Sequence, residues 1–353
     1  MDAARAREPV GSAPLAPSAA PAGPHEPAAA EARSAARFAA GVLLVLSSAV
    51  AFGAMPALAR VAYAYGATAF TLLAARFAVA WAALAVVSRV AAARGPARSG
   101  GTLRRDRVAG LLLGAALYAG TAMGFFAALQ FVPASVAALL FYTYPALVAA
   151  GSAGIHRYAP GKAQGAAVAA AVAGSALVAG ASLRDLDGRG VVLALAAAAS
   201  YAGYILLSHS VQARLGTSDL ARRVSAGALF SSLAAVLIAG DSFTAIRAPG
   251  WAAAVTLGLV STVYAVTAFL AGMARVGPTV ASVLSAAEPV TALALAALVL
   301  GEHLAPAQAV GAALIVTAVV LVSVPTSGGQ RGSRHKEEGM TRAAHSGASA
   351  PKT

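Results

Sequence analysis

A single carboxylate, Glu288, stands in the middle of a long apolar run and is followed at once by Pro289. Proline has no backbone N–H, so the carbonyl of Ser285 loses its usual helical partner. A charge at the centre of a bilayer costs about 2.5–3.5 kcal/mol on insertion scales. Glu288 could therefore bind a cationic group of a substrate or take up a proton. The alternative is a structural carboxyl, kept neutral and hydrogen-bonded to a freed carbonyl or a nearby hydroxyl.

Three further polar residues accompany this carboxylate in apolar surroundings. Ser285 and Thr291 lie about one turn on either side of Glu288, roughly on the same face of a helix. Small hydroxyls in membrane helices also bond their own backbone or a neighbouring helix. Arg76 is the one basic residue well inside an apolar run. It could bind a substrate carboxylate or pair with Glu288, or its apolar stem could let it snorkel to an interface.

Tyrosines form the second group of candidate binding residues. Tyr142 and Tyr144 directly precede Pro145. The other tyrosines within apolar runs are Tyr118, Tyr201, Tyr204 and Tyr264. Their rings and hydroxyls could line a cavity for an amphipathic or aromatic ligand. The alternative place for a membrane tyrosine is the belt at the lipid–water interface.

The composition indicates which elements must position these residues. Charged residues make up 11% of the 353, and 59% are hydrophobic, whereas a soluble domain has about 25% charged residues. The chain has no cysteine, which excludes disulfides and thiolate metal sites. The net charge of +13 lies in tails and short loops between apolar runs, a pattern of membrane topology rather than of nucleic-acid binding.

Ten apolar runs are long enough to cross a membrane. The predicted spans are 38–59, 67–88, 108–130, 133–154, 163–183, 190–208, 224–241, 250–273, 278–300 and 305–325. Residues 1–36 and 326–353 are predicted to be disordered tails because they lack apolar periodicity. With the N-terminus inside, the inner loops carry twelve Lys and Arg residues and the outer loops four. This bias predicts a multi-pass protein of the cell membrane with both termini in the cytoplasm.

The chain also repeats itself. Residues 127–168 match residues 271–312 after a shift of 144, and Pro145 then coincides with Pro289. The alternative is a chance match among low-complexity helices. Because the shift spans five helices, an odd number, the two halves would face opposite ways. Inverted repeats with equivalent helix breaks are typical of secondary transporters, whose site lies near mid-membrane between the repeats.

The second half resembles transporters of the EamA type in the drug/metabolite transporter superfamily. The residues that carry the resemblance are Gly277-Pro278, Ala281-Ser282, Glu288-Pro289-Val290, Leu300-Gly301-Glu302 and Gln308-Ala309-Val310-Gly311-Ala312. The first half is similar but weaker, and Arg157-Tyr158 stands where the second half has Gly301-Glu302. The resemblance implies an all-α membrane protein of ten helices in two inverted five-helix repeats, 37–184 and 185–325. It also implies a central cavity and alternating access.

The predicted function is therefore secondary active transport of small metabolites, such as amino acids, related compounds or drugs, and the resemblance favours outward transport. The substrate-binding prediction comprises Glu288, Arg76, Tyr142, Tyr144, Ser285, Tyr118, Tyr201 and Tyr264, with helix breaks at Pro145 and Pro289. We expect no cofactor or metal, with proton coupling through Glu288. The expected partners are the substrate and the bilayer, not nucleic acid. The alternative is a membrane enzyme acting on lipids or isoprenoids, but no phosphate-binding loop, H-E-x-x-H motif or intramembrane Asp cluster supports one.

Overall fold

The computed structural model describes residues 26–93, 103–128, 130–132, 134–155, 161–180, 187–300 and 305–323. These residues form helices and no strand, which confirms the all-α prediction. Ten helical stretches of this part of the chain are long and apolar enough to cross a membrane, as predicted. Large apolar side chains such as Ile238 and Leu298 point outward and are 88% and 83% exposed, as expected where helices face lipid.

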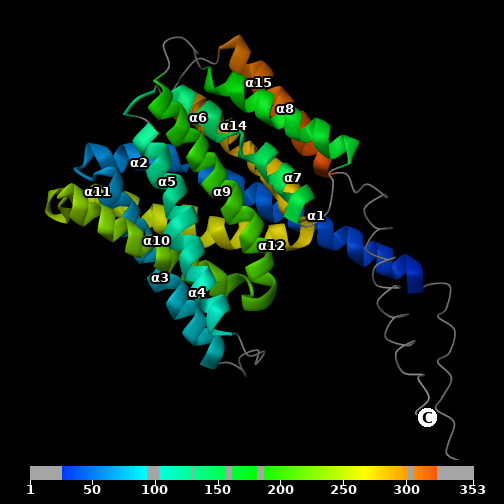
Figure 1. Ribbon diagram of the computed structural model, residues 1–353, viewed down its shortest axis with the longest axis horizontal. Helices are drawn as coiled ribbons and strands as arrows, with labels where there is room; N and C mark the ends of the chain where they lie inside the picture. Colours follow the sequence, from blue (N-terminus) through cyan, green and yellow to red (C-terminus); the bar gives the residue numbers. More distant parts are fainter. Residues whose placement is uncertain are drawn as a thin grey trace, which may run out of the picture.

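The first five spans follow one another along the amino-terminal half of the chain (Figure 1). Their segments are α1 (Glu26–Gly53), α2 (Met55–Ala64), α3 (Ala69–Ala93), α4 (Arg104–Leu112), η1 (Leu113–Tyr118), α5 (Ala119–Ala128), α6 (Ala134–Phe141), α7 (Tyr144–Ile155) and α8 (Lys162–Ala179). Segment η1 is a π-helical turn within the third span. The first span consists of α1 and α2, which meet at Ala54 just before Pro56.

The second five spans occupy the carboxyl-terminal half. Their segments are α9 (Gly188–Leu215), α10 (Thr217–Ala239), η2 (Phe243–Ala245), α11 (Ala248–Gly258), η3 (Leu259–Tyr264), α12 (Ala265–Val276), α13 (Pro278–Ser285), α14 (Ala287–Leu300) and α15 (Pro306–Ser323). Segment η3 is again π-helical and lies in the eighth span. After the 144-residue shift, η1 and η3 differ by two residues in position, so both halves interrupt their third span at nearly the same place.

Spans four and nine are each broken by a turn just before a proline. Tyr142 and Thr143 separate α6 from α7, and Ala286 separates α13 from α14. Pro145 and Pro289 then lie in the first turn of the helix that follows, where a missing N–H leaves no hydrogen bond unmade. The same shift relates Tyr142 to Ala286, so the two breaks occupy equivalent positions.

The two halves pack against each other in a reciprocal pattern. Spans five and ten pair through α8 and α15, spans two and seven through α3 and α10, and spans four and nine through α7 and α13. Span one packs on span eight through α1 and α12, while span three packs on span six through α5 and α9. If the two halves are exchanged, the first three pairings stay the same, and the pairing of spans one and eight becomes that of spans six and three. A two-fold relation between two similar units produces this kind of reciprocity.

The pair α8 and α15 lies side by side along one edge of the bundle (Figure 1). The two helices cross at Gly174 and Gly311. A Cβ added to either glycine would lie 2.6 Å from the carbonyl oxygen of the other. Only glycine therefore permits this backbone separation, which is the small-residue mode of packing that membrane helices use.

Helix α1 begins at Glu26, so the described residues 26–36 differ from the disordered tail predicted for 1–36. This stretch is rich in Ala, Glu and Arg, which have high helix propensity, and it continues the helix of the first span, with residues 31–36 exposed. The predicted tail over 326–353 and the turn at Gly301, Glu302 and His303 lie outside the described residues. Arg157 and Tyr158 lie outside them too.

The loop predicted between the sixth and seventh spans is in fact a tight helical hairpin. Helix α9 continues to Leu215, α10 begins at Thr217, and Gly216 alone joins them with a φ of 78°. This conformation suits glycine because it has no Cβ. The arginines in this stretch made it resemble a loop, but acidic partners hold them on helices. Arg214 Nε, for example, lies 2.7 Å from Asp106 Oδ1 of α4.

Candidate functional site

Glu288 lies at the start of α14, directly after the break in the ninth span. Its side chain is half-buried, and its Oε1 atom is shielded from solvent without a hydrogen-bond partner among the described residues. The position in the first turn places the carboxyl near the positive end of the helix dipole, which favours a negative charge. An unpartnered carboxyl oxygen in an apolar interior is costly. The structural alternative, a carboxyl bonded to a freed carbonyl, therefore finds no support at Oε1.

A cluster of aromatic rings adjoins this carboxyl. The rings of Tyr144 and Tyr201 are 4.8 Å apart and T-shaped, and Tyr201 stacks on Tyr204 at 6.0 Å. Tyr204 in turn lies 5.0 Å from Tyr118. Tyr142 joins at the other end, 6.2 Å from Tyr144. These distances are typical of favourable aromatic pairs, so the cluster is one continuous surface contributed by η1, α7, α9 and the break before α7.

Four tyrosines lie within electrostatic range of the Glu288 carboxyl. Tyr142, Tyr144 and Tyr201 are each within electrostatic reach of the carboxyl, and so is Tyr118. Four of the predicted tyrosines therefore gather around the one predicted carboxylate, although three different spans carry them. Phenol groups near a carboxyl can hold the cationic or polar end of a ligand, while their ring faces contact its apolar part.

Arg76 lies on α3 and is 7% exposed. Its Nη1 donates a hydrogen bond to Met55 Sδ at 2.8 Å, its Cζ lies 4.6 Å from the centroid of the Phe77 ring, and its Nε has no partner among the described residues. This burial argues against the alternative in which Arg76 snorkels to the interface. Tyr118 is within reach of both Arg76 and Glu288, so the two charged groups border the same aromatic cluster.

Ser285 ends α13 and is 1% exposed. The Tyr144 side chain lies within interaction range of Ser285, and its hydroxyl donates to the carbonyl oxygen of Ser282 at 3.5 Å. Thr291 donates to its own backbone, at Ala287 O. The polar stripe predicted around Glu288 is therefore divided: the serine contacts the tyrosine cluster, and the threonine bonds within α14.

The closeness of α1 and α14 also shapes this region. A Cβ added to Gly53, the last residue of α1, would lie 2.8 Å from the carbonyl oxygen of Glu288 and 2.6 Å from Thr291 Cβ. Any larger residue at this position would push α1 away from the helix that carries the carboxyl. Gly53 is therefore a packing residue of the site, not a ligand.

Tyr264 does not join the buried cluster. It ends η3, and its side chain is 47% exposed. Its neighbours Ser261 and Thr262 are fully buried instead. Site residues that were not predicted from the sequence include Phe77 and Phe141, which pack on Tyr118 at 5.7 Å and on Tyr144 at 5.4 Å. Each is next to a predicted site residue in the sequence, Arg76 or Tyr142, and this was the one sequence feature that could have pointed to them.

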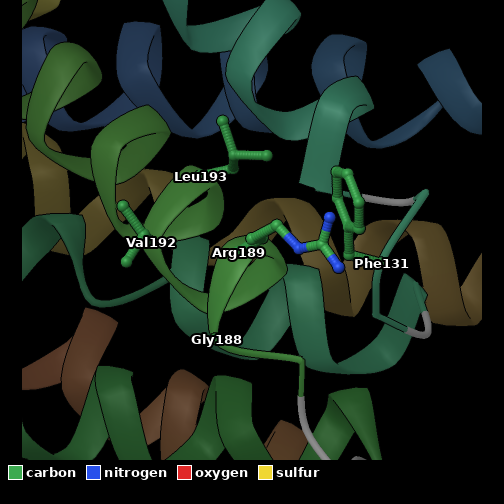
Figure 2. A pocket seen from close by; sticks show the side chains of 5 residues that line it. All are labelled: Phe131, Gly188, Arg189, Val192 and Leu193. Atoms are coloured by element: carbon green, nitrogen blue, oxygen red, sulfur yellow. The ribbon is translucent and has the colours of Figure 1, made fainter.

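A shallow hollow of about 450 Å³ lies at the start of α9, away from this cluster. Phe131, Gly188, Arg189, Val192 and Leu193 line it (Figure 2). The guanidinium of Arg189 lies over the Phe131 ring at 5.0 Å and also pairs with Asp187. Apart from Arg189, the side chains that line it are apolar, so it lacks the convergent polar groups of the Glu288 region. The described residues also contain no group of three metal-ligating side chains.

Comparisons with known proteins agree with the fold described above. The model of the EamA-like transporter family matches residues 39–180 and again residues 188–324. A protein of Bacillus subtilis (strain 168), the "Uncharacterized transporter YwfM", is 33% identical over 141 residues. That match covers 39% of this chain and 46% of the relative, so the chain spans about half the length of the curated relative. A solved structure described only as "Crystal structure of protein" superposes with a TM-score of 0.68 at 23% identity, over 80% of this chain and 96% of the other.

Proposed function

Because the chain belongs to the EamA-like transporter family, we propose that it is a secondary active exporter of small metabolites in the cell membrane. Its substrates are amino acids, related compounds or drugs that carry a charged or polar group on an apolar body. Membership of the family makes the protein a membrane transporter of the drug/metabolite type. The substrate class, the direction and the coupling belong to our proposal.

The observation that carries the proposal is the Glu288 carboxyl, which lies at a helix break, is bordered by buried tyrosines and has no hydrogen-bond partner at Oε1 among the described residues. A binding site must leave some polar atoms free for its ligand, whereas a purely structural residue would be satisfied within the fold. The carboxyl also lies in the middle of a span. A lipid-modifying enzyme would need a pair of catalytic groups near an interface, so this position supports transport over the membrane-enzyme alternative.

In our proposal, the two halves of the protein move against each other to give alternating access. The reciprocal packing of spans supports a two-fold relation between the halves. With five spans in each, the halves then have opposite orientations, and the site lies between them. Motion of one half against the other would expose Glu288 first to one side and then to the other. The excess of Arg and Lys in the inner loops supports an orientation with both termini in the cytoplasm.

Proton coupling is the simplest use of a shielded carboxyl without a salt-bridge partner in reach of its Oε1. In the proposed cycle, Glu288 binds either a proton or the substrate, and an inward proton gradient drives export through this competition. The bilayer is the protein's other partner, and the cycle requires no cofactor.

A metabolite comparison tests the proposal even while the substrate is unidentified. Metabolites are measured inside and outside cells that lack the gene, carry it, or carry the Glu288→Gln variant at equal expression. We expect a small set of compounds to fall inside and rise outside only with the wild-type gene. Identical profiles in the three strains, with the protein present in the membrane, would refute export by this site.

A further inference from the structure

One face of α9 carries three buried polar atoms that have no hydrogen-bond partner among the described residues. They are Tyr204 Oη, Ser208 Oγ and Gln212 Oε1. The three residues are 1%, 0% and 4% exposed. Buried polar groups without partners are rare in native structures, and each calls for an explanation such as an unseen water or a ligand.

The three residues lie on a single line along the helix. Tyr201, Tyr204, Ser208 and Gln212 are spaced by three or four residues, so they share one face of α9. The Tyr204 hydroxyl lies near the Ser208 side chain, one turn further on, but the two oxygens do not meet the geometry of a hydrogen bond. From Tyr201 to Gln212, the line extends about 16 Å along the helix axis, or roughly half the thickness of a hydrocarbon core.

One end of this line reaches the candidate site. Tyr201 borders Glu288 electrostatically, and its ring stacks on Tyr204. The other end reaches the hairpin at Gly216. Gln212 Nε2 donates to Thr217 Oγ1 on α10 and to the carbonyl oxygen of Leu270 on α12, both at 2.8 Å. Polar groups thus run from the centre of the bundle to the α9–α10 end.

One ion pair joins two helices at this end of the bundle, and two more lie within α10. Arg214, just beyond Gln212, pairs with Asp106 of α4, whose side chain is 5% exposed. On α10, Asp219 pairs with Arg222 at 2.6 Å and with Arg223 at 2.9 Å. The polar face is closed in this conformation, because Tyr204, Ser208 and Gln212 are buried, and the Arg214–Asp106 pair at its end can exchange its partners for water.

We propose that the α9 face formed by Tyr201, Tyr204, Ser208 and Gln212 is an aqueous access path between Glu288 and the α9–α10 end of the bundle, shown here in its closed state. In the open state, water bonds the polar atoms that now lack partners. The cost of leaving them unpaired in the closed state favours opening. The inference rests on the proposed function, because an access path serves a carboxyl that must meet water or substrate.

The absence of cysteine permits a direct test by single-cysteine labelling of the full-length protein. Ser208→Cys places a thiol on the path with little change in size. Ser232→Cys is the matched control, because Ser232 is also a fully buried serine, but its Oγ bonds the backbone at Ala228 O. Each variant is treated with a membrane-impermeant methanethiosulfonate in right-side-out and inside-out vesicles. Gln212→Cys supplies a second position on the path.

We expect Ser208→Cys to react at least about tenfold faster than Ser232→Cys from the side that holds Gly216, since the reactive thiolate forms where water reaches the sulfur. Gln212→Cys should react from the same side. Monodisperse elution and an unchanged melting temperature show that each variant is folded. If one of the two path variants does not fold, the labelling rate of the other decides the test. Equal rates for the path and control cysteines would overturn the access path. That result would leave the export test unaffected, because labelling requires no substrate.

Discussion

The hydroxyl of Tyr144 lies 3.5 Å from the carbonyl oxygen of Ser282, so a side chain of the first repeat reaches the helix that leads to Glu288. Tyr144 occupies the position in its repeat that Glu288 occupies in the other, one residue before a proline. The two halves thus contribute different chemistry at equivalent places. One supplies a carboxyl and the other a phenol, and the two groups lie within electrostatic range of each other where spans four and nine pack together.

Tyr144→Phe tests whether this phenol contributes to substrate binding. The ring contacts with Phe141 and Tyr201 remain, and one long hydrogen bond is lost, so stability should fall by no more than about 1 kcal/mol. We expect the transport KM to rise by roughly fivefold, as loss of about 1 kcal/mol of binding implies. Tyr264→Phe is the control, because that side chain is 47% exposed. Equal kinetics in both variants would remove Tyr144 from the binding surface.

The breaks before Pro145 and Pro289 yield a second prediction. Replacing either proline with alanine supplies an N–H and lets the two short helices join, which would withdraw backbone groups that can line a cavity. We expect each variant to insert normally and transport at a reduced rate, measured as flux in proteoliposomes at matched protein content. Pro306→Ala, at the start of an unbroken span, should transport normally. Normal flux in both break variants would dismiss the role of the breaks.

The crossing of α8 and α15 yields a stability prediction with an internal control. Gly174→Ala places a Cβ 2.6 Å from the carbonyl oxygen of Gly311, and this overpacking should destabilise the protein by about 1–3 kcal/mol. Gly165→Ala lies on the same helix, where an added Cβ meets nothing within 4 Å. The gain in helix propensity is similar in both variants. The difference between their melting temperatures therefore reports the destabilisation caused by the added Cβ at the helix crossing. A Gly174→Ala protein as stable as Gly165→Ala would contradict the close approach.

Local sequence patterns predicted the span count and the residues at the helix breaks. Glu288-Pro289 and Tyr144-Pro145 are noticeable because each places a polar group beside a helix breaker. Side-chain direction was harder to predict, because spans that are apolar all round carry no amphipathic signal. Tyr264 therefore could not be distinguished from Tyr118, although one is exposed and the other buried.

The helical hairpin at Gly216 was missed for a different reason. The arginines on both sides of it lower the hydropathy, and their acidic partners lie far away in sequence or on the next helical turn. The helix-ending glycine followed by Thr217, Ser218 and Asp219 was an available signal for one helix stopping and another starting. The contact of Met55 with Arg76 has no such local signal, because only the packing of α2 beside α3 creates it.

Topology can be measured with single cysteines, since the natural chain has none. Arg105 is exposed near the start of α4, and the Arg189 side chain is 76% exposed near the start of α9. We expect an impermeant thiol reagent to label Arg189→Cys in intact cells and Arg105→Cys only after the membrane is opened, as the distribution of basic residues predicts. If Arg105→Cys is labelled in intact cells and Arg189→Cys only after the membrane is opened, the proposed orientation is wrong.

Substitution of Glu288 tests the coupling mechanism, because coupling requires a side chain that can gain and lose a proton. Glu288→Gln preserves the size and most hydrogen-bonding capacity of the side chain but cannot exchange a proton. If the carboxyl only contacts the substrate, the variant should bind more weakly and keep the pH dependence of flux. If the residue is structural, Gln should be nearly silent, while Ala, which leaves a cavity, should destabilise the protein.

The decisive measurement is substrate flux in proteoliposomes as a function of the imposed pH gradient, for wild-type protein and Glu288→Gln side by side. The substrate is the compound that the metabolite comparison identifies. We predict that an inward proton gradient accelerates export by the wild type, and that Glu288→Gln inserts and folds but shows no response to the gradient. A Glu288→Gln protein with wild-type flux and wild-type pH dependence would contradict the central role of this carboxyl.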